Sequence, residues 1–276
     1  MKITALAPWF GSNRTLAVNV GASLKGCRWV GVPFAGGMCE LAHIDARTVV
    51  VGDLHKQIIN LANVLRHDKW GPQCIRALRR IPFHECTLAD AQAWISSLHW
   101  WKHPFDFDPP CNPRAAVEYF VCAWMGRNGT AGTARELNSG LSVRWDAGGG
   151  DSATRFRNAT ESLREWRDIF TRCTFVVRDV FDFLTDVKDI DGHGLYLDPP
   201  FPEVGDKYKH QFSRLNHCQL AEQLTAYDRC RVVCRFYDHP LIRELYPESA
   251  WTWHHFEGRR QTNTVGPEVL LVRNGA

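Results

Sequence analysis

Apolar and polar residues follow the same pattern twice near the start of the chain. Residues 28–34 form a short apolar run, typical of a buried strand, that leads into a pair of glycines, and residues 38–43 are expected to be helical. A second apolar run, 48–51, ends just before Asp53, and residues 57–65 place apolar side chains at helical spacing. This order of strand, helix, strand and helix predicts parallel strands joined by right-handed crossovers.

The pattern returns in the last third of the chain. Five further strands are expected, over residues 174–177, 194–197, 231–236, 250–256 and 268–272, with a helix over residues 215–227 before the third of them. The two groups of strands together predict an α/β fold with a doubly wound, mostly parallel sheet of seven strands.

Residues 66–170 interrupt this alternation. They contain four prolines between residues 104 and 113 and a stretch rich in Gly, Asn and Arg over residues 126–151. We interpret them as a mainly helical and loop-rich lobe that is inserted into a sheet domain built from residues 1–65 and 171–276.

Composition narrows the class of protein. A formal net charge of +3 over 276 residues is too small to indicate a polyanionic partner by itself. The start of the chain has no apolar stretch long enough for a signal peptide, and no apolar run reaches the roughly eighteen residues of a membrane helix. We therefore expect a cytoplasmic protein with no membrane partner.

The ten cysteines indicate neither disulfides nor a metal site. They are scattered without a Cys-x-x-Cys pair, which favours buried, reduced thiols. The ligand spacings of structural zinc sites are also absent, so we expect no metal.

Acidic and glycine residues follow several of the expected strands. In an open parallel sheet, ligands bind outside the carboxyl ends of the strands. Asp53 comes sixteen residues after Gly37, near the spacing at which a carboxylate reaches ribose hydroxyls in a nucleotide-binding unit. Asp179 and Asp198 follow two later strands. These positions favour a nucleoside ligand, although glycine turns and strand-end acids are common in other sheets.

The most specific motif is Asp198-Pro199-Pro200-Phe201, which follows the apolar run 194–197. Two prolines exclude a helix or a central strand, so the motif predicts a stiff loop at a strand end. Such a loop can offer the Asp198 carboxylate and the Pro199 carbonyl to one planar amino group, and the Phe201 ring to a stacked base. An exocyclic amine conjugated to its ring is a poor nucleophile, and two acceptors that hold its hydrogens help it attack a methyl sulfonium. The alternative is a turn whose aspartate caps a helix.

With these motifs in this order, the chain resembles the DNA adenine methylase (Dam) family of methyltransferases, which use S-adenosylmethionine (AdoMet). Five segments resemble motifs of that family: Pro8-Trp9-Phe10-Gly11-Ser12-Asn13-Arg14, Pro33-Phe34-Ala35-Gly36-Gly37, Gly52-Asp53-Leu54-His55, Arg178-Asp179-Val180-Phe181 and Asp198-Pro199-Pro200-Phe201. The inserted lobe stands where the family keeps its target-recognition domain. The resemblance covers almost the whole chain and is most specific at the last motif.

The resemblance implies a Rossmann-like methyltransferase fold and methylation of the N6 amino group of adenine in double-stranded DNA after base flipping. The catalytic residues that it implies are Asp198, Pro199, Pro200 and Phe201. The residues that it implies for AdoMet are Trp9, Arg14, Phe34, Ala35, Gly36, Gly37, Asp53 and Asp179. The DNA-contacting residues are expected in the inserted lobe, at Arg127, Asn128, Arg135, Asn138 and Arg144. We expect a monomeric, bacterial or phage-encoded enzyme, of the kind found in restriction-modification.

The chain departs from the family pattern at a few positions. Val32 stands where the family often has an acid, Met38 stands at its last glycine, and Asn13-Arg14 replaces Gly-Lys. Phe201 replaces the commoner tyrosine. None of these changes removes a group that the chemistry requires. Two alternatives stay open: methylation of the cytosine amino group, which needs the same acceptors, and a non-catalytic DNA-binding module on a methyltransferase scaffold.

Overall fold

The computed structural model describes residues 5–12, 14–98, 111–127, 129–145, 151–202, 208–259 and 265–273. The chain forms two compact units, each built from separate stretches of sequence. The first unit comprises Met1–Ser12, Gly36–Cys39 and Asp53–Val177. The second unit comprises Asn13–Ala35, Glu40–Gly52 and Arg178–Ala276.

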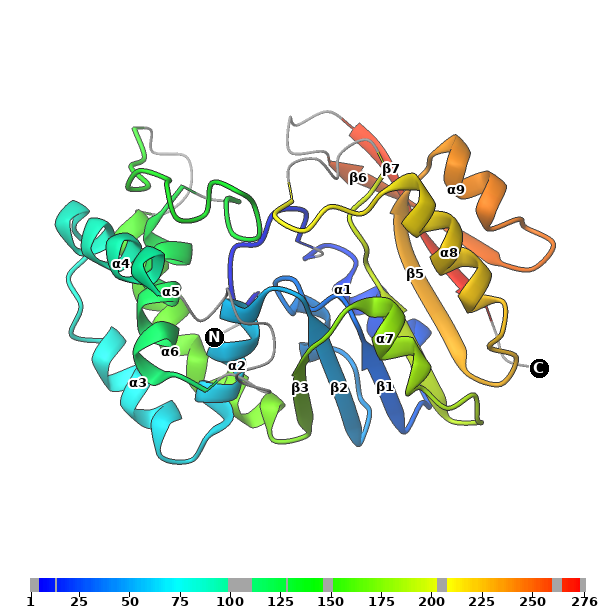
Figure 1. Ribbon diagram of the computed structural model, residues 1–276, viewed down its shortest axis with the longest axis horizontal. Coiled ribbons are helices and arrows are strands. Elements are labelled where there is room, and N and C mark those ends of the chain that lie inside the picture. The colour runs from blue at the N-terminus through cyan, green and yellow to red at the C-terminus, as the bar shows by residue number, and fades with distance from the viewer. Residues whose placement is uncertain are drawn as a thin grey trace. The chain divides into compact units, whose positions relative to one another are not determined.

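Seven strands of the described chain form one sheet, in the order β3-β2-β1-β4-β5-β7-β6 (Figure 1). Their bounds are Trp29–Val32 (β1), Thr48–Asp53 (β2), Cys173–Val177 (β3), His193–Leu197 (β4), Arg231–Tyr237 (β5), Thr252–Arg259 (β6) and Val265–Arg273 (β7). β1 pairs in parallel with β2 and β4, β4 pairs in parallel with β5, and β7 runs antiparallel to both β5 and β6. The predicted α/β fold, a doubly wound, mostly parallel and Rossmann-like sheet of seven strands, is confirmed.

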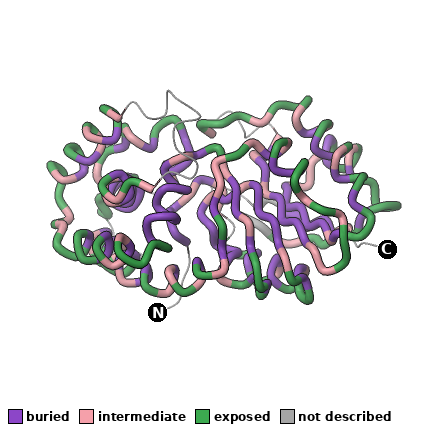
Figure 2. Tube along the Cα trace, turned by 60° about the horizontal axis from the view of Figure 1, so that its bottom comes forward, coloured by how far each residue is buried: buried purple, intermediate pink, exposed green. Residues whose placement is uncertain are grey.

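The inner strands are almost continuously apolar because both faces of a central parallel strand are covered. Residues 194–197 of β4 and 232–236 of β5 are all buried. Figure 2 shows the same burial along the strands, with exposed residues gathered in the connections. Each of the seven strands overlaps the apolar run from which it was predicted.

Four α-helices lie in those residues of the second unit that the structure describes. They are α1 (Ala17–Ser23), α7 (Val180–Thr185), α8 (Arg214–Leu224) and α9 (Pro240–Leu245). α7 packs closely on β1, since a Cβ added to Gly31 would lie 3.0 Å from the Phe183 ring. Only glycine allows this approach.

Within residues 38–43, which were expected to be helical, Cys39–Ala42 form a short 3₁₀ helix, η1. Met38, just before it, has a left-handed φ of 59°. A residue with a side chain adopts this conformation at a cost of roughly 1–2 kcal/mol.

The described part of the first unit contains five helices: α2 (Lys56–Arg66), α3 (Trp70–Leu78), α4 (Glu85–Ser97), α5 (Pro113–Met125) and α6 (Ser152–Phe170). Asn112 caps α5, and Pro113 occupies its first turn, where a missing N–H costs nothing. Asp151 caps α6 in the same way, by accepting from Thr154 N. The described part of residues 66–170 therefore has the expected helical and loop character.

The ten cysteines all lie in the described part of the chain, and all are free. Seven of them are buried, as predicted. Within the described ranges, no helix combines the length and the apolar character needed to cross a membrane.

Candidate active site

Asp198 follows β4 directly and begins the loop of the Pro-Pro motif. Its side chain is 19% exposed, so the carboxylate is largely buried. The aspartate does not cap a helix in the described structure. The next described helix, α8, is capped by Ser213, which forms a capping box with Asn216. The loop therefore leaves Asp198 available for another role.

Arg235 lies beside Asp198 because of the register between β4 and β5. Leu197 pairs with Cys234, so the residues that follow them are neighbours. The Arg235 Nη1 atom lies 3.0 Å from Asp198 Oδ2 and 3.3 Å from Oδ1. The same guanidinium bonds Glu268 of β7, with Nε 2.9 Å and Nη2 2.8 Å from Oε2. One buried guanidinium, 4% exposed, therefore holds two carboxylates.

The surroundings of Asp198 act on its charge in opposite directions. Burial is the largest effect and raises the pKa of Asp198 above its ordinary value, while the Arg235 guanidinium and a hydrogen bond from the Tyr196 hydroxyl act against that rise. Glu40 of η1 is a second buried acid near this group. Burial raises the pKa of Glu40 to about 8, and the Asp198 charge adds to that rise. Glu40 is therefore largely protonated at neutral pH, while Asp198 has a cation beside it.

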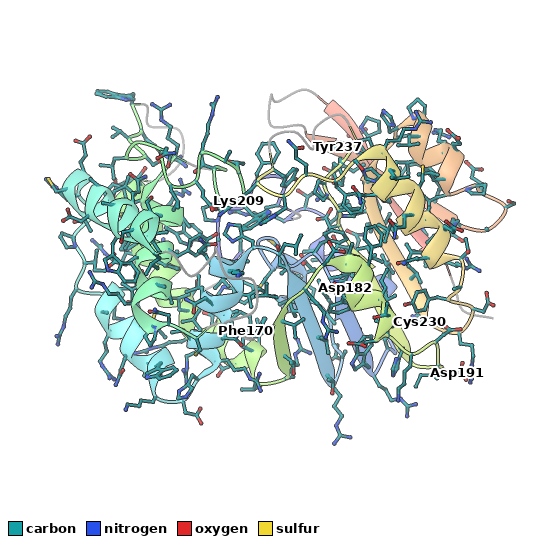
Figure 3. All side chains as sticks on the ribbon, in the orientation of Figure 1. Phe170, Asp182, Asp191, Lys209, Cys230 and Tyr237 are labelled. Carbon is teal, nitrogen blue, oxygen red and sulfur yellow. The ribbon has the colours of Figure 1, made fainter. Side chains whose placement is uncertain are left out.

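The ring of Phe201 is only 5% exposed, although we predicted it as a stacking platform. It packs edge-on against Tyr237, with ring centroids 4.5 Å apart, and the Arg235 guanidinium lies 5.2 Å from its centroid. Figure 3 labels Tyr237, the last residue of β5. The predicted stacking face is thus covered in this structure, and Phe201 instead packs against Tyr237 and against Arg235, which holds Asp198.

His217 of α8 is buried close to the same loop. Its ring centroid lies 4.8 Å from that of Phe212 and 6.0 Å from that of Phe236. Burial lowers the pKa of His217 to about 4, although the nearby Pro200 carbonyl acts against that shift. The imidazole is therefore neutral at pH 7 and supports the loop as a packed side chain.

Three half-buried aromatic rings in the second unit lie close to one another. Phe212, just before α8, meets Phe34 edge to face at 5.7 Å and lies nearly parallel to Phe181 at 6.1 Å. Asp179 sits beside them as the N-cap of α7, because its Oδ1 accepts from Phe181 N. Phe212 was missed at the level of sequence, since it belongs to no motif. Ala35 is buried, and its N–H donates to Gly52 O.

In the first unit, Asp53 organises the turn that carries two of the predicted glycines. Its Oδ2 accepts from Gly36 N at 3.1 Å, and its Oδ1 accepts from His55 N at 2.8 Å. Gly36 has a left-handed φ of 45°, and Trp9 packs against both it and Gly37. Trp9 and Asp53 are half-buried. The structure therefore brings Trp9, Gly36, Gly37 and Asp53 together.

A buried pair lies next to this turn. His55 Nε2 is 2.8 Å from Glu136 Oε1 and 2.9 Å from Oε2, and Glu136 also accepts from Gly132 N at 3.0 Å. His55 caps α2 through Nδ1, which accepts from Ile58 N, so Nε2 carries the proton donated to Glu136. No sequence pattern predicts this contact, because its two residues lie 81 positions apart in the chain.

The residues predicted to contact DNA lie mostly on one surface segment of the first unit. A bridge between Gly126 and Leu141 closes a loop, residues 126–141, and Ser142 N bonds Met125 O. The exposed members of the predicted set are Arg127, Arg135, Asn138 and Arg144. Asn128 lies outside the described residues. Trp145, next to Arg144, is 94% exposed, which is unusual for so large an apolar side chain.

Arg14 is exposed just before α1. Among the described residues, no group of three or more His, Cys, Asp or Glu side chains is arranged to hold a metal ion.

No protein-family model matches the chain, and no curated protein sequence matches it. Similar solved structures include SMU.472, assigned as a methyltransferase and crystallised with SAH, at 13% identity and a TM-score of 0.29 over 74% of this chain and 56% of that one. The N-terminal domain of human METTL16 with SAH gives 16% identity and a TM-score of 0.26 over 42% and 48% of the two chains. PH1948 of Pyrococcus horikoshii, assigned as an RNA methyltransferase, gives 14% identity and a TM-score of 0.26 over 68% of this chain and 96% of that one.

The chain spans about half the length of the first two of these structures. At such TM-scores the likenesses carry no argument about activity. The fold assignment rests on the order and direction of the strands themselves.

Proposed function

We propose that the protein methylates the N6 amino group of adenine in double-stranded DNA, using AdoMet as the methyl donor. The observation that carries the proposal is the position of Asp198. Its carboxylate stands at the end of a parallel strand, on a loop stiffened by two prolines, and is paired with a buried guanidinium. Ligands of open parallel sheets bind outside this end of the strands.

The reaction requires hydrogen-bond acceptors for the target amino group, because this group is a poor nucleophile. AdoMet supplies a methyl group on a positively charged sulfur. The Asp198 carboxylate and the Pro199 carbonyl hold the two amino hydrogens of a flipped adenine, which favours a tetrahedral nitrogen with an available lone pair. As the methyl group is transferred, the hydrogens become more acidic, and Asp198 takes one proton. The protein forms no covalent bond to the substrate. It positions and polarises the amino group and accepts one of its protons.

The described side chains fit AdoMet in their chemistry. The half-buried rings of Phe34, Phe181 and Phe212 provide apolar surface suited to a purine, and the Asp179 carboxylate suits its amino group. The Asp53 carboxylate is partly exposed and suits ribose hydroxyls. Arg14 suits the carboxylate of the methionine end. These roles belong to the proposal.

Asp53→Ala should weaken AdoMet binding by about 1–3 kcal/mol, since polar partners lose their acceptor. Isothermal calorimetry measures the change. Asp45→Ala, which removes an exposed acid of the second unit, is the matched control and should leave affinity unchanged. Unaltered affinity in a folded Asp53→Ala protein would remove Asp53 from the cofactor site.

Arg127→Ala and Arg144→Ala should both impair DNA recognition, in one of two distinguishable ways. Loss of a phosphate contact weakens binding to every sequence and lowers the salt slope by about one, whereas loss of a base contact relaxes sequence preference. Binding titrations at several salt concentrations, on specific and unrelated duplexes, separate the two. Arg47→Ala, an exposed arginine of the other unit, is the control. If both loop variants bind as the parent does, the predicted DNA surface is wrong.

Incubation with labelled AdoMet and mixed-sequence duplex DNA tests the function directly, with RNA of matching sequence alongside. Label on adenine N6 in DNA supports the proposal. Label on cytosine N4 would replace it with the alternative target, and label on RNA alone would exclude DNA as the substrate. Binding of DNA and AdoMet without any transfer would favour a non-catalytic module.

A further inference from the structure

Arg235 occupies a position where a cation is expensive. It lies in the middle of an apolar strand, with its side chain 4% exposed, and charged side chains at such positions are rare unless they are paired. Its two partners come from two neighbouring strands: Asp198 after β4, and Glu268 in β7. Breaking a buried pair of this kind is strongly unfavourable, whereas apolar residues of similar size are often tolerated. Such an arrangement calls for a functional reason.

We propose that Arg235 is the positioning residue of the active site, which fixes the Asp198 carboxylate in place and keeps it in the charged form that accepts the target amino group. The inference rests on the proposed function and adds to it a group that does not touch the substrate. Asp198 faces the Arg235 guanidinium through both of its oxygens, at 3.0 Å and 3.3 Å.

Glu268 acts as the anchor of Arg235. Its register explains the contact, since Arg235 pairs with Leu270 and Glu268 lies two residues away on the same face of β7. Two guanidinium nitrogens contact Glu268 Oε2, which leaves Nη1 directed at Asp198. Glu268, which takes no part in the proposed reaction, thus sets the orientation of Nη1.

Several other groups act on the charge of Asp198. Among the described residues, the titratable and charged groups that act on Asp198, or on which it acts, include Arg235, Glu268, Glu40, Tyr196 and Tyr208. Of these five, Arg235 alone is positively charged. Burial and Glu268 raise the pKa of Asp198, while Arg235 and the Tyr196 hydroxyl lower it. Removing Arg235 should therefore raise that pKa, and removing the charge of Glu268 should lower it.

The test uses variants that move the pH profile in opposite directions. Single-turnover methyl transfer should fall as pH drops through the pKa of Asp198, because the protonated acid no longer accepts the amine. In Arg235→Met this acid limb should move up by at least about one pH unit, since a nearby opposite charge typically shifts a pKa by 1–3 units. Arg235→Lys should restore part of the shift. Glu268→Gln, which keeps an acceptor for Arg235, should move the limb down.

Because Arg235→Met leaves two buried carboxylates without a cation, Arg235→Met/Glu268→Met is tested as well, as an apolar replacement of the pair. Its acid limb should also lie above that of the parent. A purely structural role predicts a different result, in which the rate falls by the same factor at every pH and the limb stays in place. That result would overturn the inference.

A second measurement needs no activity. Infrared difference spectra between each protein and its Asp198→Asn counterpart, recorded over a range of pH, report the protonation of this one carboxyl group. We expect Asp198 to stay ionised to lower pH when Arg235 is present, and an identical titration with and without Arg235 would overturn the inference. If the parent transfers no methyl group to DNA, the proposed function fails, while the infrared titration still decides whether Arg235 holds the charge of Asp198.

Discussion

Asp198→Ala should bind AdoMet and DNA within about tenfold of the parent and have almost no methyl-transfer activity. The carboxylate interacts more strongly with the amino group as the methyl is transferred, so its removal affects the transition state more than the ground state. Loss of one preorganised electrostatic partner typically costs about 100- to 1,000-fold in rate, and loss of proton acceptance adds to it. Pre-steady-state transfer from labelled AdoMet to duplex DNA measures the step without interference from product release.

Asp191→Ala is the matched control for this variant. Asp191 precedes β4, at the opposite end of the strand that carries Asp198, and its side chain is 71% exposed and paired with Arg229. Its removal should leave the rate unchanged. A normal single-turnover rate in Asp198→Ala would overturn the catalytic assignment and favour a non-catalytic DNA-binding module.

Glu136→Ala should lower the free energy of unfolding by about 1–3 kcal/mol, the usual cost of leaving a buried hydrogen-bond donor without its acceptor. His55 is 1% exposed and Glu136 is 4% exposed, so water cannot readily replace the lost acceptor. The change also leaves Gly132 N without the carboxylate that accepts its hydrogen bond. Urea-induced unfolding at neutral pH measures the difference.

Glu136→Gln keeps an acceptor oxygen in nearly the same place and should lose much less stability than Glu136→Ala. The comparison separates the hydrogen bonds from the volume of the side chain. A loss below about 1 kcal/mol in Glu136→Ala would mean that the pair with His55 contributes little to the stability of the first unit.

The sheet could be predicted from sequence because its strands are short apolar runs that end at Gly or Asp, and these signals are local. The ion pair between Arg235 and Glu268, which holds the guanidinium beside Asp198, could not be predicted from the sequence. Arg235 stands inside one apolar run and Glu268 at the start of another, and their partnership depends on β7 lying next to β5. A charged residue inside a buried strand was the available signal, since such a residue needs a partner.

Phe201 illustrates a second limit. The motif correctly placed a stiff loop at the end of β4, but which face of the ring is covered depends on Tyr237 and Arg235, two residues far along the chain. At Met38 the structure gives a reason for a feature of the sequence. The resemblance to the Dam family places Met38 where that family has a glycine, and the left-handed φ of 59° is a conformation that favours glycine.

The position of β7 has a consequence for how the protein is made. Asp198 and Arg235 emerge from the ribosome well before Glu268, and β7 must pass between β5 and the earlier-synthesised β6 to complete the sheet. A nascent chain that stops before residue 265 contains the whole catalytic loop but lacks the anchor of its guanidinium. Prematurely terminated products therefore lack an intact ion cluster, and synthesis must reach β7 before the chain can assemble the site that we propose for DNA methylation.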